Sequence, residues 1–375
     1  MSLGARHDGL DHDSENDEFN SITNSLPEHV WVRLSGRSKI RQRLRVSLVD
    51  NCNFRCFFCH NEGQGPILNK RHLSLSSDEL ASIVTVAARE GVKYVKLTGG
   101  EPLLFGKPPF GIVELIERLD SIRRSRDGVS FDLSMTTNGS LLARVAHLLR
   151  VAGLDRVTVS LTTQDLRTFD TLIATQQALL LRSLEGLRAA AEAGLRPLKV
   201  NTVVYQSRKT GLGNLDELFS LMAAARTLGV DELRIFTLLW HESFHDFEDY
   251  YHFFSAEMIN ALCAALRQLD VPDPDATVEV LAMLGTLFAD SAYPKVEFGV
   301  STSSMRIGFE AMKFGRLDGA SESQEGPYAI RLGADGGVRV ALNSAPSYDL
   351  IGAIRCGTRG EEAGHLYRKA LGEML

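Results

Sequence analysis

Residues 44–60 read LRVSLVDNCNFRCFFCH, an apolar run followed by a loop that contains three cysteines. The apolar run predicts a buried strand. The loop places Cys52, Cys56 and Cys59 directly after it, at a C-x3-C-x2-C spacing. The chain of 375 residues has only 5 cysteines, so most of its thiols lie in this one loop. Such a cluster is typical of metal ligation and not of a disulfide framework.

Strand-like and helix-like stretches alternate on the C-terminal side of this loop. A capping box of Ser76 and Glu79 predicts the start of the first helix, and Gly91 predicts its end. We expect strands at 44–50, 92–100, 129–139, 154–162, 197–205 and 231–240, and helices at 76–91, 111–124, 141–153, 179–194 and 214–229. About six β/α units in succession predict an α/β fold, a partial (β/α)6 TIM-like barrel with its chemistry at the C-terminal ends of the strands.

The two ends of the chain differ from this repeating middle. Residues 1–40 open with polar, charged sequence that has no hydrophobic period, which predicts a mobile N-terminal tail. Residues 41–240 form the expected barrel. Residues 241–375 are less regular, with expected helices at 256–269 and 278–288, a strand at 295–300 and a hairpin turned by Asp335 and Gly336. We interpret this part as an α+β extension that closes one side of the barrel.

The overall charge and the hydropathy limit the classes of partner. The formal net charge is -6 and the pI is about 6.0, which give no general attraction to nucleic acid or to an anionic membrane. We find no apolar run of about 18 residues that would span a bilayer. Together with the reduced thiols, this predicts a cytoplasmic protein that acts on a small molecule, without a nucleic acid or membrane partner.

The number of cysteines in the loop suggests a particular cofactor. A cubane iron–sulfur cluster is normally held by four thiolates, so three would leave one iron open to an external ligand. A TGGEP motif at 98–102 ends the second expected strand. The cysteine loop and this motif together resemble those of the radical S-adenosylmethionine (radical SAM) enzymes. The resemblance implies one [4Fe-4S] cluster on Cys52, Cys56 and Cys59, S-adenosyl-L-methionine on the open iron, and an external electron donor such as flavodoxin or ferredoxin.

The resemblance also implies a set of cofactor contacts at the ends of later strands. They are Gly99, Gly100 and Glu101 at the methionine amino group, Thr137 and Asn138 near the cofactor, and Ser160 and Lys199 at its carboxylate side. Each has a purely structural alternative: the glycines and the Asn138–Gly139 pair are common in turns, and Ser160 would suit a helix cap. Their joint position at successive strand ends favours the cofactor interpretation.

Within that superfamily the chain is similar to the GTP cyclases of molybdenum-cofactor synthesis, at VKLTGGEPLL (95–104), MTTNGSLL (135–142) and AGLRPLKVNTVV (193–204). Arg45, Lys96, Arg234 and Arg331 match basic positions that hold the triphosphate there. Three positions depart from the pattern, because Gln324, Pro327 and Ala341 stand where the cyclases have the cysteines of a second cluster.

We therefore expect hydrogen abstraction from a small, phosphorylated nucleoside- or sugar-like substrate. The alternatives are the GTP cyclase reaction itself, a peptide-modifying enzyme, and an inactive binding protein of the same fold. The matching cations have a structural alternative of their own, which is pairing with Asp or Glu inside the barrel.

Zinc is the alternative metal. The three loop cysteines would need His60, Cys263 or Cys356 as a fourth ligand, although structural zinc ligands usually come as two separated pairs. Cys263 lies on an apolar helix face, which favours a core position. Residues 241–245 read HESFH and match HExxH, but they follow a strand and not the helix that this zinc motif requires. We expect His241 and Glu242 to line the substrate pocket and to donate a proton or a hydrogen bond there.

Overall fold

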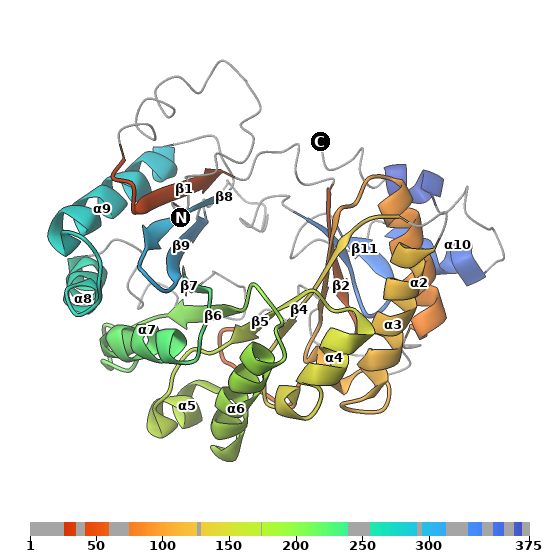
Figure 1. Cartoon of the computed structure of the whole chain (residues 1–375), viewed down its shortest axis with the longest axis horizontal. Helices are drawn as coiled ribbons and strands as arrows, with labels where there is room; N and C mark the ends of the chain where they lie inside the picture. The colour runs from red at the N-terminus through yellow and green to blue at the C-terminus, as the bar shows by residue number, and fades with distance from the viewer. Residues whose placement is uncertain are drawn as a thin grey trace.

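The computed structural model describes residues 26–34, 42–59, 75–125, 129–173, 175–238, 256–290, 295–312, 329–339, 348–355 and 364–369. Within these ranges the strands form one 12-stranded sheet in the order β1-β8-β9-β7-β6-β5-β4-β3-β2-β10-β11-β12. The sheet is curled, and helices cover its convex outer side (Figure 1). We term the concave side of the sheet the lumen.

The six middle strands are parallel and confirm the predicted partial (β/α)6 barrel. The strands are β2 (Arg43–Ser47), β3 (Tyr94–Thr98), β4 (Asp132–Thr137), β5 (Arg156–Ser160), β6 (Lys199–Val204) and β7 (Glu232–Thr237). The helices between them are α2 (Ser77–Arg89), α3 (Gly111–Arg124), α4 (Ala146–Ala152), α5 (Leu166–Ile173), α6 (Ala178–Glu192) and α7 (Leu218–Thr227). Short 3-10 helices, η3 (Pro102–Leu104), η4 (Leu142–Arg144) and η5 (Leu215–Glu217), connect some of them.

The first helix begins where the sequence predicts. The Ser76 hydroxyl accepts a hydrogen bond from the Glu79 backbone N–H, and the Glu79 carboxylate accepts one from the Ser76 N–H at 2.9 Å. This reciprocal pair satisfies two of the backbone donors that a helix start leaves without partners. The capping box therefore sets where α2 begins, on the outer face of the barrel.

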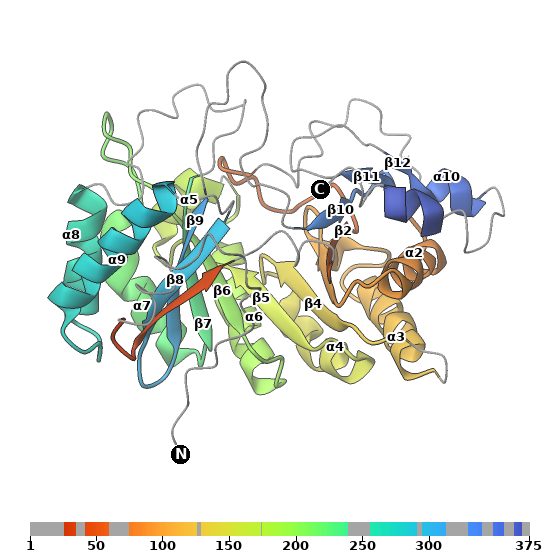
Figure 2. The ribbon, with the colours of Figure 1, turned by 90° about the horizontal axis from the view of Figure 1, so that it is seen from above.

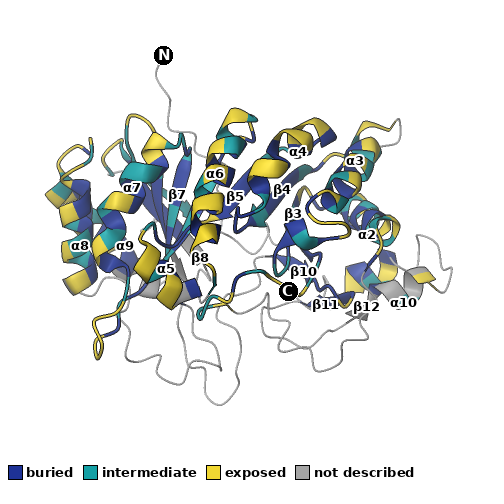
Figure 3. Ribbon diagram, turned by 90° about the horizontal axis from the view of Figure 1, so that it is seen from below, coloured by how far each residue is buried: buried dark blue, intermediate teal, exposed yellow. Residues whose placement is uncertain are grey.

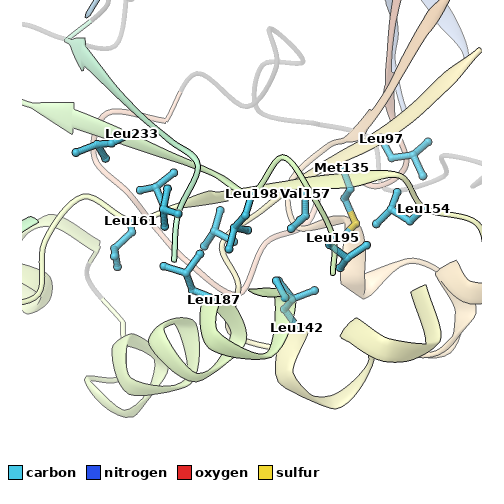
Figure 4. Packing of buried hydrophobic residues seen from close by; sticks show 14 of the residues in the cluster. Leu97, Met135, Leu142, Leu154, Val157, Leu161, Leu187, Leu195, Leu198 and Leu233 are labelled. Carbon is cyan, nitrogen blue, oxygen red and sulfur yellow. The ribbon is translucent and has the colours of Figure 1, made fainter. Parts of the chain in front are cut away.

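The hydrophobic core lies between the sheet and the helices. Val95 and Leu97 of β3 are at most 1% exposed. In Figure 4, Leu142 and Leu187 lie on the side of the sheet toward which Met135 points. Side chains alternate along a strand, so the positions between these apolar residues face the lumen. The exposed positions of the helices lie on their outward faces (Figure 3).

Strands from both ends of the chain extend the barrel at its two edges (Figure 2). On the β7 side lie β9 (Arg306–Met312), β8 (Lys295–Ser301) and β1 (Val30–Leu34), and on the β2 side lie β10 (Ile330–Leu332), β11 (Gly337–Arg339) and β12 (Tyr348–Asp349). The remaining helices are α8 (Ala256–Leu266), α9 (Pro274–Asp290), α10 (Leu350–Arg355) and a segment at 364–369. None of the helices in the described ranges is long and apolar enough to cross a membrane.

Two sequence-based expectations about the ends of the chain need correction. The expected tail of residues 1–40 contains β1, which pairs antiparallel with β8 over five residue pairs, from Val30 with Val300 to Leu34 with Val296. The C-terminal part does not close one side alone, because β8 and β9 extend one edge and β10 extends the other. Residues 1–25 and 35–41 lie outside the described residues.

Strand β1 packs against β9 through an aromatic side chain. The Arg306 guanidinium lies over the Trp31 ring, 4.1 Å from its centroid. Across the sheet, Gly308 leaves room for that ring, since a Cβ built on it would stand 2.9 Å from Trp31 Cη2 and 3.1 Å from Cζ2. The glycine thus allows the indole of β1 to pack closely against β9.

Replacement of Gly308 by alanine should weaken the packing of Trp31 against β9. We expect the free energy of unfolding, measured by urea denaturation, to fall by about 1–3 kcal/mol, the usual cost of overpacking. In a Trp31→Phe background the same change should cost less, because the phenyl ring lacks the two atoms that would clash. An equal cost in both backgrounds would show that the indole does not require the glycine.

Candidate functional site

The cysteine loop follows β2 at the C-terminal end of the barrel. Cys52 and Cys59 are exposed, Cys56 is partly buried, and none of the three forms a disulfide. The Arg55 N–H donates to the carbonyl of Ile173 in α5 at 3.0 Å. The Phe57 ring meets Tyr205, at the end of β6, edge to face at 5.0 Å between centroids. The loop is therefore held by α5 and by the end of β6, while two of its thiols keep exposed surface.

Two glycines allow the β3 turn to touch this loop. Gly99 has φ +136°, and a Cβ on it would stand 2.4 Å from the Val49 carbonyl oxygen. A Cβ on Gly100 would stand 2.1 Å from the Asn51 carbonyl oxygen. The backbone contact includes a 2.7 Å hydrogen bond from the Gly100 N–H to the Val49 carbonyl. Only glycine fits at both positions, so the glycines of the TGGEP motif have a definite structural role beside the cysteines.

Glu101 connects the C-terminal ends of β3 and β4. Its carboxylate accepts hydrogen bonds from the Thr137 hydroxyl at 2.6 Å, the Asn138 N–H at 2.8 Å and the Leu103 N–H at 3.1 Å. The residue is 1% exposed, and this burial raises the pKa of its carboxyl to about 7. Glu101 therefore ties the end of β3 to the end of β4, close to the cysteine loop.

Asn138 connects the end of β4 to the cysteine loop. Its side-chain amide donates to Asn53 Oδ1 at 2.8 Å and lies 3.8 Å from the Cys52 sulfur. Its Oδ1 accepts from the Ser140 N–H at 3.0 Å and from the Ser140 hydroxyl at 2.7 Å. The structure thus brings together Cys52, Glu101, Thr137 and Asn138, as the sequence pattern predicts.

The buried thiols of the loop need a positively charged partner. Desolvation raises the pKa of Cys52 to about 11, and it also raises the pKa of Cys56 above its ordinary value. Their thiolates thus need a cationic partner such as iron. Among the described residues, no three Cys, His, Asp or Glu side chains converge on a point where one metal ion would sit. A cubane does not require such convergence, because each cysteine binds a different iron of the cluster.

Arg331, Arg45 and Lys96 are cross-strand neighbours, and we term them the basic row. The parallel register pairs Arg331 with Arg45, and Arg45 with Lys96. Residues in register share a face, and adjacent strands lie about 4.8 Å apart. Because the flanking Leu44 and Val46 are buried toward the helices, the basic row faces the lumen.

Lys96 has no ion-pair partner among the described side chains. Burial, followed by the charges of Arg45 and Arg234, holds its pKa well below the ordinary value. Mutual repulsion of this kind is relieved when an anion binds between the cations. The basic row is therefore suited to hold an anionic group.

The β6–β7 side of the lumen holds cations that already have carboxylate partners. Glu232 accepts from Lys199 Nζ at 2.8 Å and from Arg234 Nε at 2.5 Å. Glu297 of β8 lies 2.9 Å from Arg33 Nη1 and 3.9 Å from Arg234 Nη2. Although burial acts to raise it, the pKa of Glu232 is lowered to about 2 by Arg234 and Lys199. Pairing with a barrel carboxylate, the structural alternative for the matching cations, is thus observed for Arg234.

Ser160 and Lys199 lie at different levels of the barrel. The register pairs Ser160 with Asn201 and Thr158 with Lys199, so Lys199 lies nearer the N-terminal ends of the strands. Asn201 Oδ1 is buried and has no hydrogen-bond partner in the part of the chain that the structure describes. A buried amide oxygen without a donor is costly, so Asn201 is placed to accept a hydrogen bond from a ligand.

Sequence reasoning missed Asn201, Glu232 and Glu297. The alternation of KVNTVV (199–204) places residues 199 and 201 on one face and gives a signal for Asn201. No comparable signal exists for Glu297, since its partners Arg33 and Arg234 are far from it in sequence.

Several predicted residues lie outside the described residues. His241 and Glu242, together with the rest of the HExxH match, fall in residues 239–255. The positions that depart from the cyclase pattern, Gln324, Pro327 and Ala341, are also outside, as are His60 and Cys356. Cys263 lies on α8 and packs against the hydrophobic core, as its apolar helix face predicts.

Comparison with known proteins shows to which family this chain belongs. Residues 46–209 match the family described as the Radical SAM superfamily. A protein of Streptomyces coelicolor described as GTP 3',8-cyclase is 34% identical over 352 residues, which cover 92% of this chain and 89% of that protein. A Sulfurisphaera tokodaii protein described as probable GTP 3',8-cyclase is 39% identical over 195 residues, which cover 52% of this chain. This chain spans 55% of that relative's length.

Solved structures support the fold alone. Streptococcus suis SuiB bound to S-adenosylmethionine aligns with a TM-score of 0.51 at 13% identity and covers 86% of this chain and 67% of its own. The structure of anSMEcpe with bound AdoMet aligns with a TM-score of 0.51 at 14% identity and covers 88% of this chain and 76% of its own. Both alignments are consistent with the curled α/β sheet described above.

Replacement of Gly100 by alanine should displace the cysteine loop. The new Cβ would stand 2.1 Å from Asn51 O and 2.9 Å from Asp50 O, and both are backbone atoms of the loop. We expect the variant to keep its far-ultraviolet circular dichroism but to bind less than about half of the wild-type iron after anaerobic reconstitution, since relief of overpacking must move the ligands.

Gly91→Ala is the matched control. Gly91 has φ +101° and no atom within 4 Å of a built Cβ, so it tests backbone strain without a clash. This variant should lose about 1–2 kcal/mol of stability and keep its iron. Equal iron binding by the two variants would contradict the proposed role of the glycine contact.

Proposed function

Because the chain belongs to the radical SAM superfamily, in the branch of the GTP 3',8-cyclases, we propose that it abstracts hydrogen from a small, phosphorylated nucleoside- or sugar-like substrate. The superfamily uses a [4Fe-4S] cluster and S-adenosyl-L-methionine. When bound, these cofactors supply a 5′-deoxyadenosyl radical by one-electron cleavage. The protein's own residues bind the cofactors, orient the substrate and exclude water.

We assign the cluster to Cys52, Cys56 and Cys59. The support is their position on one loop at the end of β2, with no disulfide and with two thiols exposed. Asn138, 3.8 Å from the Cys52 sulfur, would donate a hydrogen bond to that ligand. Such contacts orient metal ligands and tune the cluster.

We place S-adenosyl-L-methionine at the C-terminal ends of β3 to β6, over Gly99, Gly100, Thr137, Asn138 and Ser160. The carboxylate of Glu101 already accepts three hydrogen bonds, so its first role is to brace this surface. Lys199 is kept as a proposed ligand, although Glu232 holds it at a lower level of the lumen.

The basic row is the observation that carries the substrate class. Arg331, Arg45 and Lys96 lie in register on one face, and a bound anion would offset their repulsion. Arg234 faces the same lumen and contributes to the lowered pKa of Lys96. A phosphate group is the anion that such a set of lysine and arginine side chains binds well.

The cyclase reaction proper is the second candidate, and the identity over 92% of the chain to a protein described as GTP 3',8-cyclase favours it. The residues at positions 324, 327 and 341 argue against it, because Gln, Pro and Ala cannot replace three cysteine ligands. The two reactions therefore differ in how many clusters the protein holds.

Further roles are proposed on sequence grounds. His241 and Glu242 would line the substrate pocket and donate a proton or a hydrogen bond. A flavodoxin- or ferredoxin-like protein would supply the electron. A reducing cytoplasm suits the thiolate ligands.

Anaerobic reconstitution tests the proposed cofactor chemistry. We expect about four irons per chain, as one cubane requires, and formation of 5′-deoxyadenosine with dithionite and S-adenosyl-L-methionine. Alanine at Cys52, Cys56 and Cys59 together should abolish both. About eight irons per chain would instead support a second cluster and the cyclase reaction. Wild-type protein that binds iron but forms no 5′-deoxyadenosine with any substrate would support a binding role.

Replacement of Lys96 by methionine tests the basic row. The change keeps the length of the side chain and removes its charge, so the affinity for inorganic phosphate should fall about 10- to 100-fold by calorimetry. Lys93→Met is the matched control, because Lys93 is an exposed residue shortly before the same strand. An unchanged affinity in the Lys96 variant would remove the basic row from the site.

A further inference from the structure

Two buried N–H groups without a hydrogen-bond acceptor lie together on β9 and β1. They are Nε of Arg306 and Nε1 of Trp31, and neither has an acceptor in the part of the chain that the structure describes. The Arg306 guanidinium lies over the Trp31 ring, 4.1 Å from its centroid, so the two donors belong to side chains in contact. A buried donor without an acceptor is costly. Two such donors side by side therefore indicate a ligand that accepts hydrogen bonds.

The register places Arg306 in the lumen. It pairs with Glu232 of the parallel strand β7, and residues in register share a face of the sheet. The next two residues of the opposite face, Ile307 and Phe309, are at most 2% exposed. In the sheet, β7, β6, β5, β4 and β3 separate β9 from β2. Arg306 is therefore not part of the basic row.

The carboxylates closest to Arg306 in the sheet are bound to other cations. Both oxygens of Glu232 accept hydrogen bonds from side chains of β6 and β7, at 2.8 and 2.5 Å. Glu297 Oε2 lies 2.9 Å from Arg33 Nη1. Within the described residues Arg306 has no ion pair of its own, and burial holds its pKa below the ordinary value although both carboxylates act to raise it. An anionic ligand would compensate this charge.

Trp31 is fixed in a position that supports the guanidinium. The register places Trp31 beside Gly299 of β8, and Gly299 beside Gly308 of β9. The indole reaches across β8, because a Cβ built on Gly308 would stand 2.9 Å from its Cη2 atom. A guanidinium that packs on an aromatic face can still use its planar fork of N–H donors, which matches two oxygens of a phosphate. The indole N–H supplies one further donor.

We propose that Arg306 and Trp31 form an anion subsite of the lumen that is separate from the basic row and binds a phosphate group of the ligand. The inference rests on the proposed function only in taking this ligand to be the substrate. Phosphate oxygens would accept from both buried donors and compensate the guanidinium charge. Strands β1, β8 and β9 lie side by side at one edge of the sheet (Figure 2). The subsite gives these strands a role in recognition, which the six parallel strands alone would not provide.

Nuclear magnetic resonance of the anaerobically reconstituted protein tests this, because the indole N–H of Trp31 reports on the subsite directly. The chain has 2 tryptophans, so a Trp240→Phe variant assigns the Trp31 peak in a proton–nitrogen correlation spectrum. Titration with inorganic phosphate should shift this peak to saturation. In Arg306→Met, whose side chain can still pack on the ring, the affinity obtained from this shift should fall about 10-fold or more.

Two further variants and a second probe complete the test. Arg306→Lys keeps the charge without the planar fork and should lose about 3-fold in affinity, and it decides the matter if Arg306→Met does not fold. Arg267→Met is the matched control, because Arg267 lies in an exposed ion pair with Asp275. It should change the phosphate affinity less than about 2-fold. Acetate is the second probe, and tighter binding of acetate than of phosphate would overturn the assignment to a phosphate group.

The outcomes separate this inference from the proposed function. A phosphate-dependent shift of the Trp31 peak that persists in Lys96→Met and is lost in Arg306→Met supports a subsite apart from the basic row, even if Lys96→Met leaves the calorimetry unchanged and the basic row fails. If Lys96→Met removes phosphate binding in calorimetry but the Trp31 peak of the wild type does not respond to phosphate, the basic row stands and the subsite is overturned. The same titration midpoint in Arg306→Met as in the wild type also overturns it.

Discussion

The close contact between two backbone segments, Gly99–Gly100 and residues 49–51, is the constraint on which the rest of the site depends. Neither glycine tolerates a Cβ there, because carbonyl oxygens of the loop occupy the space. The contact fixes the cysteine loop relative to β3, and Glu101 and Asn138 extend the same fixation to β4. Three loops from three strands therefore form one surface. A cluster and its cofactor need such a surface, because ligands on independently moving loops would not keep their relative positions.

The arrangement of charged side chains in the lumen follows from the register of the parallel strands. Parallel pairing in register places a residue of one strand beside the equivalent residue of the next, so cations on neighbouring strands necessarily become neighbours in space. Beside β2 this produces the basic row, and between β6 and β7 it places Glu232 beside Lys199.

Much of the barrel was predictable, because local signals carried it. The capping box at Ser76, the apolar runs of the parallel strands and the glycines after them agree with the structure. The features that the sequence did not predict have one cause in common, which is that they depend on residues far apart in the chain. Strand β1 follows polar sequence and forms because β8 offers a partner far away in the chain, and β9 has Gly308 at its centre to admit Trp31. The pairs of Lys199 with Glu232 and of Arg234 with Glu297 were equally hidden, since they depend on which strands lie side by side.

The pairing of β10 with β2 also has a consequence for biosynthesis. Strand β2 is made early and β10 late, so on the ribosome one edge of β2 keeps its backbone hydrogen-bonding groups without their final partner while some 280 further residues, from Ser47 to Ile330, are translated. An unpaired strand edge of this kind invites association with other chains. We therefore expect the nascent polypeptide to depend on chaperones until its last third has emerged.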